Sequence, residues 1–100
     1  MDNGMRTDPR IAQNVKSRAK TKVKPWETVR VEIYPTKMIP TRDYLFVPHR
    51  FLGHEGFSAE VQKVNPFGNK FCINITNGGS KSKWLFRDRK IGRLMLRETF

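Results

Sequence analysis

Apolar and polar side chains alternate along much of the chain after residue 25, which is the spacing of a half-buried β-strand. The first such run predicts a strand over 29–34, whose apolar positions are Val29, Val31 and Ile33. A second strand is predicted over 44–47, where the apolar run stops at Pro48. The glycine-containing segment 53–56 then predicts a turn.

Residues 57–76 predict a β-hairpin closed by Asn65-Pro66-Phe67-Gly68, a sequence that favours a type I turn followed by a glycine bulge. If Asn65 faces Asn69, one face of the hairpin carries the pairs Val61–Ile73, Ala59–Ile75 and Lys63–Phe71. The other face carries the pairs Glu60–Asn74, Gln62–Cys72 and Ser58–Thr76. A slip by one residue would destroy this sorting of apolar from polar side chains, so the pattern predicts this register.

Residues 1–25 contain no aromatic residue and only scattered apolar ones, so they predict a basic tail ahead of a folded domain at 26–100. Asp8-Pro9 is typical of a helix start, and apolar residues recur every four positions after it. The tail is therefore either disordered or a short helix that ends near Thr21. At the other end, residues 81–100 predict two short strands, with a strand and a helical turn as the alternative.

The net charge of +11 is concentrated at the two ends of the chain. Residues 1–25 hold seven Lys and Arg against two acidic residues, a net charge of +5, and residues 81–100 hold seven against two, again +5. The body between them holds six against five, a net charge of +1. Cationic ends of this kind attract polyanions, because each neutralised phosphate releases condensed counterions.

The chain from about residue 42 to residue 90 resembles KOW and Tudor-type SH3-like barrels in its glycine turn, following strand and hairpin. The residues that carry the resemblance are Phe46-Val47, Gly53, Gly56, Ala59-Glu60-Val61, Val64 and Phe71-Cys72-Ile73-Asn74-Ile75. It implies a mainly β fold, a small SH3-like barrel, and a family habit of binding nucleic acids or their machinery. The pattern of about five short strands also suits an OB-like barrel. The four-aromatic cage of methyl-lysine readers is missing from the sequence, so that activity is not implied.

Two aromatic residues lie among basic ones. Phe67, at the predicted hairpin tip, either points outward, where it could stack on an unpaired base or wedge into a minor groove, or folds back over the barrel. Trp84 lies between lysines and an arginine, as aromatic residues do in nucleic-acid grooves. A Trp at the head of an apolar strand, however, is more often part of the core.

The sequence offers little for catalysis or metal binding. His49, His54 and Cys72 are the soft ligand candidates, and their spacing matches no standard zinc arrangement. The chain has no glycine-rich phosphate loop and no paired acidic cluster, so we expect no enzyme, metal or cofactor. A single cysteine excludes an internal disulfide and favours a reducing, intracellular compartment, cytoplasmic or nucleoid-associated. No apolar run is long enough to span a bilayer, so no membrane role is expected.

The sequence thus favours a non-enzymatic nucleic-acid-binding module of transcription, translation or nucleoprotein assembly, with DNA against RNA left open. The residues expected to contact nucleic acid are Arg10, Lys16, Arg18, Lys20, Lys22, Lys24, Lys63, Phe67, Lys70, Lys81, Lys83, Arg87, Arg89, Lys90 and Arg93. The alternative is a small adaptor or inhibitor that docks on an acidic protein surface, such as a virus-encoded factor acting on a host polymerase or nuclease. The basic ends serve both hypotheses, because charge steers either kind of association.

Overall fold

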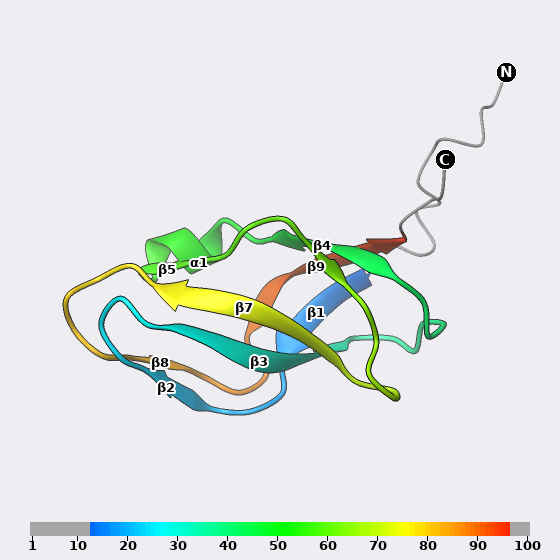
Figure 1. Ribbon diagram of the computed structural model, residues 1–100, viewed down its shortest axis with the longest axis horizontal. Coiled ribbons are helices and arrows are strands. Elements are labelled where there is room, and N and C mark those ends of the chain that lie inside the picture. The colour runs from blue at the N-terminus through cyan, green and yellow to red at the C-terminus, as the bar shows by residue number, and fades with distance from the viewer. Residues whose placement is uncertain (1–12, 97–100) are drawn as a thin grey trace, which may run out of the picture.

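The computed structural model describes residues 13–96, and this part of the chain is mainly β (Figure 1). It contains nine strands and one short helix, where the sequence predicted about five strands. In chain order the elements are β1 (Gln13–Ser17), β2 (Thr21–Val23), β3 (Thr28–Pro35), β4 (Tyr44–Pro48), α1 (Phe51–His54), β5 (Phe57–Ser58), β6 (Gln62–Val64), β7 (Phe71–Asn77), β8 (Lys83–Leu85) and β9 (Lys90–Leu96).

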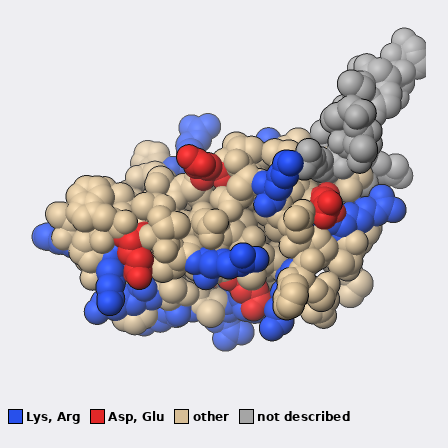
Figure 2. All heavy atoms as spheres, viewed as in Figure 1, with Lys and Arg blue, Asp and Glu red and all other residues tan. Residues whose placement is uncertain are grey.

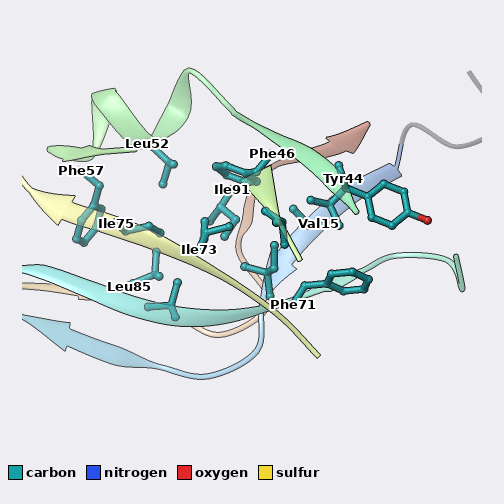
Figure 3. Close-up of a cluster of buried hydrophobic side chains, with 14 of the residues drawn as sticks. Val15, Tyr44, Phe46, Leu52, Phe57, Phe71, Ile73, Ile75, Leu85 and Ile91 are labelled. Atoms are coloured by element: carbon teal, nitrogen blue, oxygen red, sulfur yellow. The ribbon is translucent and has the colours of Figure 1, made fainter. Parts of the chain in front are cut away.

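Seven of these strands form one curled sheet in the order β5-β7-β3-β1-β9-β4-β6, and β2 and β8 form a separate two-stranded ribbon. Every strand pairing is antiparallel. Figure 3 shows the core between β4 and α1 on one side and β7 and β3 on the other. The strands predicted over 29–34 and 44–47 are confirmed as β3 and β4.

The core follows from the period-two pattern of β3 and β7. These two strands pair along most of their length, with Val31 opposite Ile73 and Ile33 opposite Phe71. All four side chains are buried, while the residues between them face away from the core. Since each pair brings apolar surface together on one face, the alternation read from the sequence is sufficient to build this half of the sheet.

The predicted hairpin is confirmed at its base and wrong above it. Ser58 pairs with Thr76 in the expected register, but β6 then leaves β7 and pairs with β4. The side chain of Gln62 bridges the gap: its Oε1 accepts a hydrogen bond from the Asn74 N–H at 3.0 Å, and its Nε2 donates to the Asn74 carbonyl at 3.3 Å. The amide thus replaces a peptide group in the ladder, and the predicted Val61–Ile73 pairing is lost, with Val61 exposed.

The turn predicted over 65–68 is also wrong. The chain reverses at Gly68-Asn69, because Phe67 and Lys70 exchange both backbone hydrogen bonds. Gly68 has a φ of +67°, which is the conformation that a type II′ hairpin turn requires at its first central position. Phe67 is therefore the first residue of the observed turn over 67–70, whereas it was the third residue of the predicted turn over 65–68.

The prediction that residues 1–25 are disordered or form a short helix is wrong for the described part of that segment, residues 13–25. Gln13–Ser17 is β1, a strand inside the sheet between β3 and β9, and Thr21–Val23 is β2. Val15 and Ser17 are both fully buried. Both side chains point inward, as alternate residues of a strand do, but Ser17 is polar and was not counted as a core position. The remaining apolar residues of this segment are therefore four positions apart, which is the spacing of a helix. The expected domain boundary at Pro25 therefore does not separate residues 13–25 from the sheet, and residues 1–12 lie outside the described part.

The described part of the C-terminal segment contains two strands, β8 and β9, as favoured from the sequence. The turn expected over 53–56 starts within α1 and is completed at Gly56, whose φ is +85°.

Candidate nucleic-acid interface

The described parts of the two cationic ends, residues 13–25 and 81–96, lie side by side in the fold. β1 pairs with β9 and β2 pairs with β8, so basic residues near both ends of the chain become neighbours. Ser17 joins the two segments: its N–H and its carbonyl bond to the backbone of Arg89 and Asp88, at 2.9 and 2.8 Å. Its hydroxyl donates to the Phe86 carbonyl and accepts from the Arg89 N–H. In Figure 2, lysine and arginine side chains gather along the lower edge, where Figure 1 places β2 and β8, and others lie elsewhere on the same face.

The β2–β8 ribbon has one face on the core and one in solvent. Val23 and Leu85 are buried, so the inner face of the ribbon covers the core. Lys22 and Trp84 are opposite each other in the register and point to the outer side. Continuing this alternation by one step along each strand adds further exposed residues to the same side. We call this surface the ribbon face, and it consists of Lys20, Lys22, Lys24, Trp84 and Phe86.

Lysine and aromatic side chains contact one another on the ribbon face. The Lys20 ammonium lies 4.5 Å from the centroid of the Trp84 ring and 5.5 Å from that of Phe86. The Trp84 residue is 45% exposed and Phe86 is 53% exposed. The interpretation of Trp84 as a core residue is therefore wrong. Its ring is partly exposed and lies against a lysine ammonium group. Phe86 was not among the residues that the sequence predicted to contact nucleic acid.

The side chain of Asn77 holds the β2–β8 ribbon against the sheet through hydrogen bonds. It is fully buried, and its Nδ2 donates to the carbonyls of Val23 and Lys81 at 3.0 and 2.8 Å. Its Oδ1 accepts a hydrogen bond from the Gly79 N–H at 3.0 Å. One side chain therefore connects the end of β7 to β2 and to the β7–β8 turn, which fixes the ribbon against the sheet.

A strained turn displays a further aromatic residue next to Lys24. The Glu27 N–H donates to the Lys24 carbonyl at 3.1 Å, with Pro25 and Trp26 as the central residues. Trp26 has a φ of +61°, which is the type II turn position that normally takes glycine. Its side chain is held in solvent, since the residue is 67% exposed. An aromatic residue in a left-handed conformation is costly and uncommon, so it marks a functional candidate.

Several predicted contact residues lie off the ribbon face. Lys83 points to the inner side, where a side chain at Gly56 would collide with its ammonium group. Arg89 forms an ion pair with Glu55. Lys81 is exposed in the turn before β8. The residues predicted from the sequence to contact nucleic acid therefore do not form one continuous surface.

Arg18 and Arg87 belong to a surface network around Tyr34. Arg18 pairs with Glu32 at 3.4 Å and its guanidinium lies 4.7 Å from the Tyr34 ring centroid. The Tyr34 hydroxyl donates to an Asp88 carboxylate oxygen, and Arg87 lies 3.8 Å from the same carboxylate. The hydrogen bond to Asp88 raises the pKa of Tyr34, because it favours the protonated phenol.

Of the two alternatives for Phe67, an outward-pointing ring or one folded back over the barrel, the structure shows the first: the residue is 81% exposed. It lies with Lys63 and Lys70 at the β6–β7 tip, next to the start of β7 at Phe71. The ribbon contacts the other end of β7 at Asn77, so the tip and the ribbon face are separated by the length of this strand, about 20 Å. The predicted residues therefore form at least two separate groups.

Lys16, Lys90 and Arg93 form another basic group on the paired strands β1 and β9. Arg10 lies outside the described residues.

No family model matches the chain, and no curated protein matches it. Within residues 13–96, no three His, Cys, Asp or Glu side chains are grouped as a metal site requires. In the same part of the chain, no helix has the length and apolar character needed to cross a membrane.

Proposed function

We propose that this protein is a non-enzymatic module that binds single-stranded nucleic acid on the ribbon face. The observation that carries the proposal is the Lys20 ammonium against the half-exposed rings of Trp84 and Phe86, with Lys22 opposite Trp84 in the strand register. Aromatic rings interleaved with cations are the arrangement that stacks bases and neutralises phosphates. The proposed setting is intracellular, in transcription, translation or nucleoprotein assembly.

The geometry favours an unpaired strand over a duplex. Trp84 in β8 and Phe86 just after it are two residues apart in extended chain, so their side chains start about 7 Å apart. The bases of a duplex stack on one another and present only their edges in the grooves, whereas an unpaired base offers its whole face to a ring. Stacking of this kind contributes about 1–3 kcal/mol per base.

Lys20 has a second role in this proposal. In the free protein its ammonium lies on the rings that a base would cover. An incoming base displaces it, and its flexible stem then lets the charge reach a phosphate of the same strand. Lys22 and Lys24 supply two more phosphate contacts along the adjacent strand.

The curled sheet supports the proposed likeness to SH3-like barrels. The Gln62 side chain joins β6 to β7, two strands near opposite ends of the sheet order. A curled sheet whose two ends are joined in this way gives the ribbon a rigid base on which to hold its rings.

Fluorescence anisotropy tests the proposal with a labelled single strand, the matching duplex, and a salt series. We expect the single strand to bind more tightly, with a log–log salt slope of about −2 if three phosphates are contacted. Trp84→Ala should weaken single-strand binding at an unchanged slope, whereas Met38→Ala, a fully exposed residue outside the ribbon face, should bind as the parent does. Equal binding of Trp84→Ala and the parent would contradict the proposal. A protein partner that stays bound to the parent after nuclease treatment, with no single-strand binding, would favour the adaptor hypothesis instead.

A further inference from the structure

A hollow of about 390 Å³ lies on the outer side of the sheet, and none of its lining residues belongs to the ribbon face. Strands β1, β4 and β9 and the β4–α1 connection contribute to it. It is lined by Asn14, Val47, Pro48, His49, Arg50, Lys90, Gly92 and Arg93. None of these lining residues is acidic, and three carry a permanent positive charge at neutral pH.

A β-bulge brings two of the cations to the same side of β9. Lys90 and Arg93 are three residues apart, so strict alternation would point them to opposite faces. The register of β1 against β9 shifts between Val15 and Lys16, and Ile91 and Gly92 both turn inward. The extra residue returns Arg93 to the outer side with Lys90, which is how bulges redirect side chains.

The cations that line the hollow form no ion pair with a carboxylate among the described residues. Lys16 is directly opposite Lys90 in the strand register, an unfavourable placement of like charges. The ion pairs found within residues 13–96 involve Arg18, Arg87 and Arg89, and none involves Arg50, Lys90 or Arg93. A bound anion would relieve the repulsion among these groups.

His49 adds a directed hydrogen-bond donor to the hollow. Its Nδ1 accepts the Phe51 N–H at 3.1 Å, so in the neutral ring the proton is on Nε2. The imidazole stacks on the exposed Phe51 ring, with centroids 4.7 Å apart and an interplanar angle of 25°. This stack holds the orientation of the imidazole and presents an aromatic surface beside the cations.

The backbone of Gly92 lines the hollow, although this residue turns toward the core. A Cβ at this position would collide with the Val47 carbonyl oxygen and with the Phe46 ring. β4 and β9 can therefore approach closely only with glycine here.

We infer that this hollow binds a phosphate monoester group. Lys90 and Arg93 of β9 and Arg50 of the β4–α1 connection line it together, and a concave site with several cations favours a compact dianion over the single charges of a phosphodiester chain. The same chemistry is offered by the terminal phosphate of a nucleic-acid strand and by a free mononucleotide. The site does not involve the ribbon face, so it goes beyond the proposed function and stands without it.

Calorimetry with AMP and with inorganic phosphate tests the site on the full-length protein. We expect saturable binding of at least one of them, weakened about tenfold or more by Arg93→Gln and by Arg50→Gln, since each removes a charged hydrogen-bond donor. Arg42→Gln is the matched control, because Arg42 is exposed and precedes the opposite end of β4. If the parent binds neither AMP nor phosphate, or if Arg42→Gln weakens binding as much as Arg93→Gln, the inference is wrong.

Two oligonucleotides distinguish the sources of the phosphate. A strand with a 5′-phosphate should bind about tenfold more tightly than the same strand with a 5′-hydroxyl, and Arg93→Gln should bring this ratio to about one. Binding of AMP without any such ratio assigns the site to a free nucleotide and still supports it. Trp84→Ala should weaken both strands equally and leave the ratio unchanged. A failure of the ribbon face is thereby distinguishable from a failure of the hollow.

Discussion

The ribbon face and the β6–β7 tip both display aromatic side chains near lysines, yet they are built differently. On the ribbon face, Trp84 and Phe86 lie under the ammonium group of Lys20, and buried Asn77 fixes the strands beneath them. At the tip, Phe67 is more exposed than either ring, at 81%, and a two-residue turn holds it through hydrogen bonds with Lys70.

The difference shows that exposure alone does not make a binding surface. A ring that is already oriented by a packed strand loses little freedom when a base stacks on it. A ring at the end of a short hairpin must be ordered when the ligand binds, and that cost reduces the affinity it contributes. We therefore expect the ribbon face to contribute more to binding than the tip, and four experiments test this comparison.

The largest effect is expected from loss of the anchor of the ribbon. Asn77→Ala leaves two backbone carbonyls without their donor, so we expect a loss of about 3 kcal/mol in the free energy of unfolding. Single-strand binding should fall with it, because the ribbon is no longer fixed. Urea denaturation measures the stability, and Asn69→Ala, an exposed asparagine of the tip, is the control and should change it little. Equal stability of the two variants would mean that the anchor is unimportant.

Loss of a stacking ring is expected to have the next largest effect. Trp84→Ala should cost about 1–3 kcal/mol of single-strand binding, and Phe67→Ala should cost no more than about a factor of two in affinity. Both are measured by anisotropy at one salt concentration. If Phe67→Ala has the larger effect, the tip is the main binding surface and the ribbon is not.

Loss of a single cation should change the salt dependence. Lys22→Gln should reduce the steepness of the log–log salt slope for single-strand binding by about 0.7, since one phosphate contact is lost. Lys70→Gln, at the tip, should leave the slope unchanged. A salt series for the parent and both variants measures the slopes, and equal slopes for the two variants would remove the distinction between the regions.

The smallest effect is expected at the two turns with left-handed residues. Trp26→Gly should raise the free energy of unfolding by about 0.5–1 kcal/mol, because glycine adopts a φ of +61° without strain. Gly68→Ala at the tip should lower it by about 1 kcal/mol for the opposite reason, although the space there is open. Denaturation curves measure both. A more stable Trp26→Gly variant that also binds more weakly would show that the strained turn serves binding.

The sequence by itself determined the elements whose side chains alternate without interruption. Val31 and Ile33 in β3 and Ile73 and Ile75 in β7 follow the period of two, so their burial could be predicted from spacing alone. The base of the hairpin at Ser58–Thr76 was predicted for the same reason. The basic character of both ends of the chain was likewise readable from composition.

The tertiary structure decided which strands meet and which charges become neighbours. Ser17 is a polar residue at a buried position, and it is tolerated because backbone groups of residues 86–89 satisfy its hydroxyl. The ribbon strands are three residues long, too short for a periodic signal, so Trp84 and Phe86 could not be assigned to the surface. Gln62 took the place of a peptide group, which no local rule predicts. Such pairings form between residues far apart in the chain, and their free energy depends on partners that only the folded protein brings together.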